Sequence, residues 1–534
     1  MYAVVEAVCR AAAIGADASK LRLSMQEYFP KLHTAHTWGL PFSALMGAYE
    51  ACCALELPAI GGKDSMSGTF MDKEVPPSLI CFAVGVMDGR DTISNEFKKA
   101  GHTVVFVPVP CDEHEVVDFA ALKTLLANVH KGILAKQIVT AGVVKEGGVA
   151  AGISTMCLGN GLGFGFVKPF LHEECLFTLQ PGGFLVELAD GSDADKVFAG
   201  SDFLVLGSLN DSGKVTVNDT DISLDEIKAA YTGTLESVFP SIVKDSGKAI
   251  VNMPYYKAEL PLTAPYNVAK PRVFIPVFPG QNCEYDTAKA FEAAGAEADI
   301  FVLRNLKPED VKESVDEMVK RLKQAQILAI PGGFSASDEP EGSGKFIATM
   351  FRHPALKEAV LDLLEERDGL ALGICNGFQA LIKLVLVPYG DIRPLTPESP
   401  TLTFNTIGRH ISRMVETKVV SNKSPWLALC EPGDIHTIAI SHGEGRFVAP
   451  EETIKELFKN GQVGTQYVNQ AGDATMESPY NPNGSLYAIE SITSPDGRVL
   501  GKMGHSERFE EGLMKNIPGN KLQPIFKAGV QYFK

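Results

Sequence analysis

The strongest constraint on the fold is the alternation of apolar runs with amphipathic segments over residues 271–534. Buried strands are predicted for "RVFIPVF", "ADIFVL", "QILAI" and "GLALGI", and helical spacing is clearest in "PEDVKESVDEMVKRLKQA". Strands that alternate with helices form parallel sheets, because each crossover helix returns the chain to the same edge. We therefore expect an α/β domain with its site at the carboxyl ends of the strands.

The sequence before residue 271 is organised differently. Residues 1–90 run from helical patterns into the strand-like "SLICFAVGVMD", and residues 91–250 mix strand candidates such as "HTVVFVPVP" with helices. This mixture predicts α+β packing. Residues 251–270 contain several prolines and little periodicity, which is typical of a linker.

Charge and cysteine usage limit the class of protein. The net charge is −16, which argues against a nucleic-acid groove as the main surface. No signal peptide and no apolar run of membrane-spanning length is visible. The ten cysteines form no CxxC pair and no zinc-type spacing. These features predict a cytoplasmic protein with free thiols, no membrane or nucleic-acid partner and no metal site.

The stretch "LALGICNGFQA" has the pattern of a nucleophile elbow. An apolar strand ends at Cys375, and Gly373 and Gly377 lie two residues to either side, where a tight strand-to-helix turn needs small residues. The helix start would favour the thiolate, and the N–H of Asn376 would face a developing oxyanion. Taken alone, the motif fits a buried structural cysteine equally well.

A thiol nucleophile also needs a base and a second oxyanion donor. His505 and Glu507 in "GKMGHSERF" are two residues apart, so in an extended segment they project to the same side. Gly332 and Gly333 lie where a predicted strand ends and can present a free backbone N–H. The ordinary alternatives are a surface histidine and a plain turn. Cys283 in "PGQNCEYD" lacks the second glycine, and we interpret it as structural.

The segment "GGKDSMSG" offers a second candidate site. Gly62, Lys63, Asp64 and Ser65 could hold a phosphate, since glycine backbone and a lysine are suited to that role. The GxxxxGK[ST] spacing of a P-loop is absent. A glycine-rich turn with a packing role is the alternative.

Several motifs together resemble a known family. "GICNGFQAL", "PGGFSASDE", "HGEGRF" and "HSER" are similar to the class I (triad) glutamine amidotransferases, with the same order of cysteine and His-x-Glu. "NCEYDTAKAFEAAGA" and "NPNGSLYAIESITSPDGRVLGKMGHSER" narrow the resemblance to the phosphoribosylformylglycinamidine synthases of purine biosynthesis. "LPAIGGKDSMSGTF" and "VPPSLICFAVGVMD" resemble the second synthase repeat of the large single-chain type.

The resemblance implies a fold and roles for individual residues. It implies a flavodoxin-like parallel sheet with flanking helices over 271–534, preceded by a PurM-like synthase half: an incomplete part of the second repeat (1–90), the repeat's C-terminal domain (91–250) and a linker (251–270). It assigns the nucleophile to Cys375, the base to His505 and the third triad position to Glu507. Gly333 and Asn376 match the oxyanion hole. The glutamine-binding candidates are Gly332, Gln379, His442 and Glu444.

The resemblance also implies substrates and partners. Glutamine would be hydrolysed here, and the ammonia used for ATP-dependent amidination of formylglycinamide ribonucleotide, with ATP and Mg²⁺ bound by the complete enzyme. We expect a missing N-terminal synthase half, because the first repeat and the start of the second are absent. The chain alone would then be only a glutaminase. The alternatives are a catalytically silent scaffold, the glutaminase of another amidotransferase, or a thiol hydrolase on the same fold.

Two departures from the family pattern concern sites. "GVVKEGG" stands where many members have an aspartate-rich stretch, so a magnesium–nucleotide site at Val143–Gly148 is not expected. Ser506 replaces a more usual proline next to His505, which should leave the triad intact.

Overall fold

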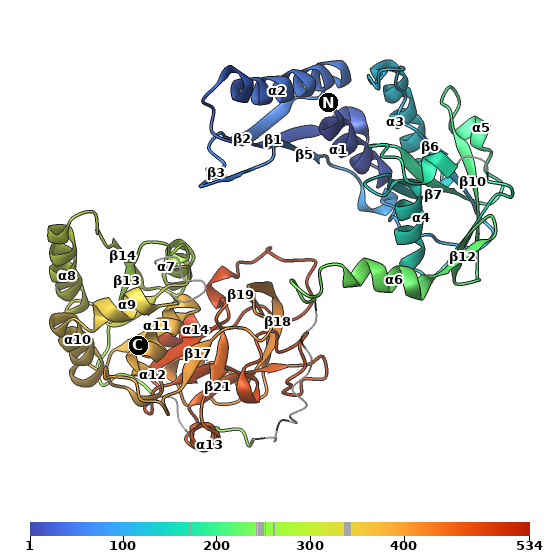
Figure 1. The fold of residues 1–534 in the computed structure, drawn as a ribbon. Coiled ribbons are helices and arrows are strands. Elements are labelled where there is room, and N and C mark those ends of the chain that lie inside the picture. Colours follow the sequence, from blue (N-terminus) through green and yellow to red (C-terminus); the bar gives the residue numbers. More distant parts are fainter. Residues whose placement is uncertain (171–172, 242, 244–249, 251–252, 260–261, 336–342) are drawn as a thin grey trace. The chain divides into compact units, whose positions relative to one another are not determined.

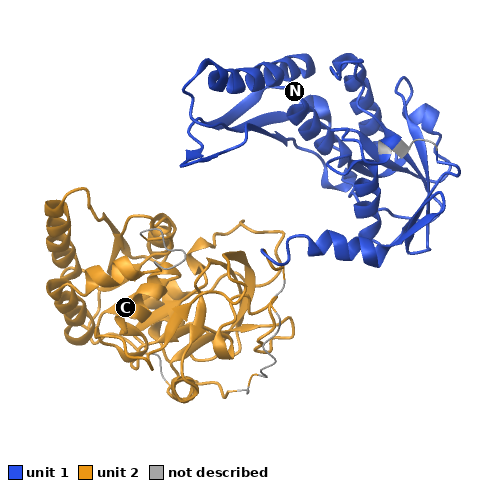
Figure 2. Ribbon diagram, in the orientation of Figure 1, with its two compact units in different colours: residues 1–238 blue, residues 239–534 orange. Residues whose placement is uncertain are grey.

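The computed structural model describes residues 1–534 except 171–172, 242, 244–249, 251–252, 260–261 and 336–342. The chain divides into two compact units, unit 1 (Met1–Val238) and unit 2 (Phe239–Lys534) (Figures 1 and 2). None of the described helices is both long and apolar enough to cross a lipid bilayer.

Unit 1 begins with a small sheet of order β2-β1-β5, in which β1 is parallel to β2 and antiparallel to β5 (Figure 1). Its elements are α1 (Tyr2–Ala13), β1 (Arg22–Tyr28), α2 (Ala35–Leu55), β2 (Ala59–Ser65), β5 (Ser78–Val84) and the short strands β3 (Thr69–Phe70) and β4 (Lys73–Glu74). Helix α2 starts at a capping box, in which Thr34 Oγ1 accepts a hydrogen bond from the Thr37 N–H.

Helix α2 is apolar on two sides. Pro41, Ala48, Ala51 and Leu55 are buried. The opposite side exposes a second set of large apolar residues, which we call the α2 face: Trp38, Phe42, Leu45, Met46 and Tyr49, each 57–69% exposed. Water-soluble helices normally present a polar outer side, so this face is unusual.

The rest of unit 1 is a seven-stranded sheet of order β12-β11-β8-β10-β6-β9-β7, antiparallel except between β8 and β11. Its strands are β6 (Thr103–Val107), β7 (Ile138–Val143), β8 (Gly163–Phe166), β9 (Phe184–Leu188), β10 (Leu204–Asn210), β11 (Lys214–Val217) and β12 (Thr220–Ser223). Its helices are α3 (Phe119–Leu134), α4 (Gly148–Leu158), α5 (Ala194–Val197) and α6 (Leu224–Gly233). The expected α+β packing is confirmed.

Unit 2 is built on a nine-stranded sheet of order β14-β13-β15-β16-β23-β22-β21-β18-β19. The strands are β13 (Arg272–Val277), β14 (Glu297–Val302), β15 (Ile327–Ile330), β16 (Leu370–Ile374), β18 (Ile411–Val419), β19 (Ile435–His442), β21 (Val463–Val468), β22 (Ile489–Thr493) and β23 (Val499–Lys502). The first five in sheet order are parallel, as expected. The other four are antiparallel, which we did not predict.

Most helices of unit 2 lie around the parallel part of this sheet, and α13 (Glu451–Lys459) lies near β21 (Figure 1). The other helices are α7 (Glu284–Ala293), α8 (Pro308–Leu322), α9 (Lys345–Phe351), α10 (Pro354–Leu361), α11 (Asn376–Leu384), α12 (Leu386–Tyr389) and α14 (Ile525–Gln531). Two short strands, β17 (Thr401–Thr403) and β20 (Arg446–Val448), pair separately. One large core joins the strands β13, β15, β16 and β23 to these helices.

The segment expected to be a linker lies along unit 2. Tyr256 N–H donates to Val420 O (2.9 Å), Ala264 N–H to Tyr532 O (2.8 Å) and Val268 N–H to Phe533 O (2.7 Å). Residues 251–252 and 260–261 of the segment lie outside the described residues. The described remainder is therefore tied to the C-terminal unit by backbone hydrogen bonds.

Candidate active site

Cys375 lies at the sharp turn between β16 and α11. Its φ of 52° and ψ of −104° are outside the regions that residues with a side chain favour. A Cβ on Gly377 would lie 2.0 Å from Ile330 O, and one on Gly373 would lie 2.6 Å from the Gly377 carbonyl carbon. Both glycines are therefore required for the turn, and the predicted elbow geometry is present.

The thiol of Cys375 is buried, and the residue is 4% exposed. Its Sγ lies 3.6 Å from Ser441 O, at the end of β19. Burial raises the pKa of the Cys375 thiol, and negative charge on Cys283 and Glu507 acts in the same direction. Arg508 and the Asn376 N–H oppose the shift. The helix start was expected to favour the thiolate, but burial outweighs it, so a base is needed to remove the proton.

His505 is the N-cap of a single turn, η7 (Ser506–Arg508), which follows β23 and contains Glu507. His505 Nδ1 lies 2.6 Å from Glu507 Oε1, and both side chains are buried. Burial alone would raise the pKa of the Glu507 carboxyl, but the charge and hydrogen bond of His505 lower it overall. Glu507 is therefore ionised and orients the ring. His505 Nε2 has no hydrogen-bond partner among the described residues.

Gly332 lies close to both His505 and Cys375. A Cβ at this position would lie 2.8 Å from His505 Cε1 and 3.5 Å from Cys375 Cβ. Gly332 and Gly333 follow β15, and Gly333 has a φ of 133°. A Cβ on Gly333 would lie 2.5 Å from Gln281 Cα. Gly332 thus lets the backbone after β15 pass close to the elbow, and Gly333 lets it pass close to the backbone around Gln281. Their role as oxyanion and glutamine contacts stays a prediction.

The elbow and this backbone are joined by an amide network. Ser335 N–H donates to Asn376 Oδ1 (3.4 Å), and Asn376 Nδ2 donates to Gln379 Oε1 (2.9 Å). Gln379 Nε2 donates to Glu444 O (2.8 Å). Three of the predicted residues thus form one chain of contacts beside Cys375.

His442 and Glu444 are also brought to this place, at the end of β19. His442 Nε2 accepts a hydrogen bond from Asn483 Nδ2 (3.1 Å), which fixes a neutral ring. Burial lowers the pKa of His442 to about 3, and the nearby His505 contributes. Glu444 is 6% exposed, and its Oε1 has no partner among the described residues.

Cys283 is a member of the site that the sequence did not indicate. It precedes α7, and its Sγ lies 3.3 Å from Arg508 Nη2. Ligand atoms of Cys283, His505 and Glu507 lie within 4.8 Å of one another. Such a group can bind a transition metal, but the short bond to Glu507 already engages His505 Nδ1. The sequence feature that could have indicated this position for Cys283 is that "NC" follows β13, a strand parallel to β15.

The four phosphate candidates form part of a strand. Gly62 to Ser65 belong to β2 and pair with Met25 to Tyr28 of β1. A Cβ on Gly62 would lie 2.5 Å from Met25 O, so this glycine has a packing role. Lys63 Nζ donates to Ser65 Oγ. The glycine-rich turn expected here is a strand in the structure, and phosphate binding stays a prediction.

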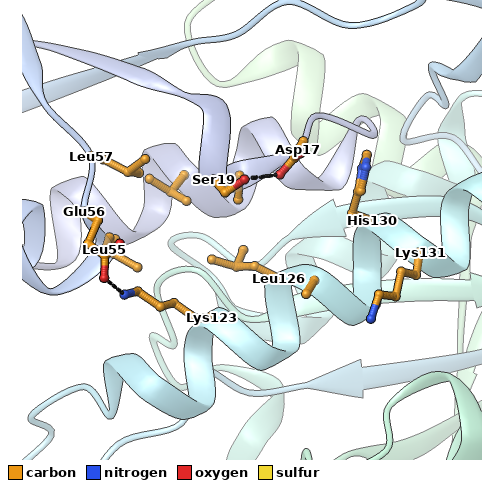
Figure 3. A pocket seen from close by; sticks show the side chains of 12 residues that line it. Asp17, Ser19, Leu55, Glu56, Leu57, Lys123, Leu126, His130 and Lys131 are labelled. Atoms are coloured by element: carbon orange, nitrogen blue, oxygen red, sulfur yellow. Dashed lines mark hydrogen bonds and ion pairs between the residues drawn. The ribbon is translucent and has the colours of Figure 1, made fainter.

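A pocket of about 410 Å³ in unit 1 includes none of the predicted site residues (Figure 3). Two of its basic side chains already have partners. Lys123 Nζ lies 2.9 Å from Glu56 Oε1, and His130 Nδ1 lies 3.0 Å from Gly15 O. We assign no ligand to it.

Comparison with known proteins places the similarity in unit 2. Residues 270–533 match the CobB/CobQ-like glutamine amidotransferase domain. The phosphoribosylformylglycinamidine synthase subunit PurQ of Aquifex aeolicus is 32% identical over 246 residues, which are 46% of this chain and 94% of that protein. The PurQ subunit of Methanococcus maripaludis is 36% identical over 290 residues, covering 49% of this chain and 98% of that protein. The solved structure of PurLQS from Thermotoga maritima is 27% identical, with a TM-score of 0.36, over 50% of this chain and all of that one.

Proposed function

The chain belongs to the PurQ family of glutamine amidotransferases of phosphoribosylformylglycinamidine synthase, and from this premise we propose that Cys375, His505 and Glu507 hydrolyse glutamine. The observation that supports these roles best is the buried His505–Glu507 pair. Its Nε2 has no partner among the described residues, and the ring and Cys375 both lie close to Gly332, a residue without a side chain. A histidine oriented by a carboxylate next to a thiol is the arrangement of nucleophilic catalysis.

The reaction proceeds in two halves. Cys375 Sγ attacks the carboxamide carbon of glutamine while His505 Nε2 takes the thiol proton. The N–H groups of Asn376 and Gly333 stabilise the oxyanion. His505 then returns the proton to the leaving nitrogen, ammonia departs, and a glutamyl thioester remains. His505 next takes a proton from water, whose oxygen attacks the thioester carbon. The bond to Cys375 Sγ then breaks, glutamate is released, and His505 returns the proton to Sγ.

The glutamine backbone would be held by the loop after β19. Glu444 has a buried carboxylate oxygen without a partner among the described residues, which suits an α-ammonium group. Gln379 and His442 would hold this loop in place. Gln379 Nε2 donates to Glu444 O, and His442 O accepts from Asn405 Nδ2. Gly332 leaves room for the side chain of the substrate.

We further propose that the ammonia is used by a synthase half outside this chain, where ATP, Mg²⁺ and formylglycinamide ribonucleotide bind. The α2 face supports such a partner, because a contiguous exposed apolar patch is typical of a protein interface. The buried, protonated thiol of Cys375 fits a glutaminase that is slow in isolation. Glutamate release by the chain should therefore rise when the synthase half is added.

The test compares two nitrogen sources in the assembled enzyme. Cys375→Ala should abolish product formation with glutamine and retain it with ammonium salts, because only hydrolysis needs the thiol. Cys430→Ala, which removes another buried thiol of unit 2, should retain both. Loss of the ammonia-dependent reaction in Cys375→Ala would contradict the separation of the two sites.

A further inference from the structure

Unit 2 contains a buried ion pair that the glutaminase mechanism does not use. Lys502 ends β23 and Glu490 lies on the neighbouring strand β22, with Nζ 3.6 Å from Oε1. Their side chains are 1% and 0% exposed. Removing two charges from water is costly, and apolar residues in such places are often at least as stable. The pair is therefore poorly explained by stability alone.

Three hydrogen bonds of the pair lead to the residues that flank His505, and a further one joins Thr465 Oγ1 on β21 to Glu490 Oε2. Gly504 N–H donates to Glu490 Oε1 (2.6 Å), and Lys502 Nζ donates to Gly504 O (2.7 Å). On the other side of His505, Lys502 Nζ donates to Ser506 Oγ (2.9 Å). Both neighbours of the base are thus held by one pair of charges.

Gly504 packs closely against the ion pair, so a side chain at this position would have to displace its charged groups. A Cβ on Gly504 would lie 3.0 Å from Glu490 Oε1, 3.1 Å from Lys502 Nζ and 2.7 Å from Ile438 Cγ2. Ser506 Oγ donates onward to Gln523 Oε1 (2.7 Å). A proline at position 506 could make neither bond, so the serine that departs from the family pattern completes the network in this chain.

We propose that Lys502 and Glu490, together with Ser506, are positioning residues that fix the His505 ring against Cys375. This inference rests on the proposed function. A displacement of about 1 Å in a catalytic group can lower the rate by about 100-fold. The pair acts on the base and touches neither the thiol nor the loop that would hold the glutamine backbone. Its loss should therefore lower kcat for glutamine hydrolysis and leave KM nearly unchanged.

The experiment uses the double variant Lys502→Met/Glu490→Gln in the assembled enzyme, so that no unpaired buried charge remains. We expect kcat to fall by about 10- to 100-fold, KM to stay within about twofold, and the unfolding midpoint to be retained. The control is Arg272→Met/Asp299→Asn at the β14–β13 edge of the same sheet, which removes the ion pairs of Asp299 with Arg272 and Arg321 and should leave kcat unchanged. A stable double variant with wild-type kcat would overturn the proposal.

Ser506→Ala covers the case in which the double variant does not fold. It deletes one hydroxyl, and we expect an unchanged unfolding midpoint with kcat lowered severalfold. Wild-type kcat in a folded Ser506→Ala would also overturn the proposal. Cys375→Ala is measured in parallel: if the wild type shows no activity above this variant, the proposed function itself fails, and the failure is not attributed to the positioning residues.

Discussion

The backbone conformation of Cys375 restricts which residues can occupy the neighbouring positions. Its positive φ and the close approach of β15 leave no space for side chains at positions 373 and 377. The sequence indicated this elbow because the steric requirement falls on two nearby positions, and both are glycines. The strain stored there is typical of catalytic turns.

The first prediction concerns Gly377. Gly377→Ala should lower the free energy of unfolding of unit 2 by about 1–3 kcal/mol or more, because its Cβ would lie 2.0 Å from Ile330 O. Urea denaturation followed by circular dichroism measures the change. Gly39→Ala, in helix α2 with open space around it, should be neutral or stabilising. Equal stability of Gly377→Ala and wild type would show that the elbow relaxes freely.

The second prediction concerns His442 and acid stability. The folded protein keeps this ring neutral, with a pKa of about 3, while the unfolded chain binds a proton near pH 6.5. The unfolded state therefore binds more protons between these values, and stability falls as the pH drops below 6.5, by about 1.4 kcal/mol per pH unit. Above pH 6.5 the ring contributes no pH dependence.

Unfolding at pH 7.5 and pH 5.5 tests this effect. Wild type should lose roughly 1 kcal/mol more than His442→Gln over this interval, since the glutamine does not titrate. The same loss in both proteins would mean that His442 is protonated in the folded state.

Cys283, Lys502 and Glu490 could not be predicted from local patterns. The thiol of Cys283 reaches Arg508 across 225 positions of sequence. Lys502 and Glu490 meet only because β22 and β23 pair in one register. By contrast, Cys375, His505 and Glu507 each belong to a short motif. Local motifs identified the reacting groups, whereas the groups that surround them depend on the tertiary fold.

At the scale of elements, the parallel part of the unit 2 sheet followed from its apolar runs. Strand β16 is buried throughout and appears in the sequence as a continuous apolar segment, while the buried helix α11 that follows it shows helical spacing. The antiparallel strands were missed because polar residues interrupt their apolar runs, even in β21 (VGTQYV) and β22 (IESIT), which are buried throughout. In β18, half-buried and exposed positions alternate with buried ones, and Arg413, Glu416 and Lys418 interrupt the apolar pattern.

The third prediction tests the packing of α11 against β16. Leu381 is fully buried, and its Cδ1 would lie 2.6 Å from a Cβ on Gly373. Leu381→Ala should reduce the free energy of unfolding by about 2–5 kcal/mol, and Glu358→Ala, an exposed change on α10, by less than about 0.5 kcal/mol. Chemical denaturation of both variants provides the comparison. A cost below 1 kcal/mol for Leu381→Ala would contradict the packing described.

At the scale of the whole molecule, the family similarity and the exposed apolar surface lie in different units. Unit 2 is matched almost end to end, while the α2 face belongs to unit 1. The sequence indicated the division into an α+β part and an α/β part. The α2 face could not be predicted from the sequence. A helix that is apolar on all sides is usually buried, so its sequence does not show which side is exposed.

The fourth prediction addresses that face. Phe42→Asp/Tyr49→Asp should weaken binding to the synthase half by at least tenfold, because charges would be buried in an apolar interface, and should leave the stability of the free chain unchanged. Sedimentation velocity and calorimetric titration measure both quantities. Phe177→Asp, which changes an exposed residue elsewhere in unit 1, should bind normally. Unaltered binding by the double variant would rule out the α2 face as the contact.

The central claim is that Cys375 is the nucleophile, and trapping its acyl intermediate tests it most directly. The assembled enzyme is mixed with isotopically labelled glutamine, quenched in acid and digested, and the peptides are mapped by mass spectrometry. We predict one labelled glutamyl group on Cys375 and none in Cys375→Ala. A label on Cys283, or sustained glutamine hydrolysis by Cys375→Ala, would contradict the account.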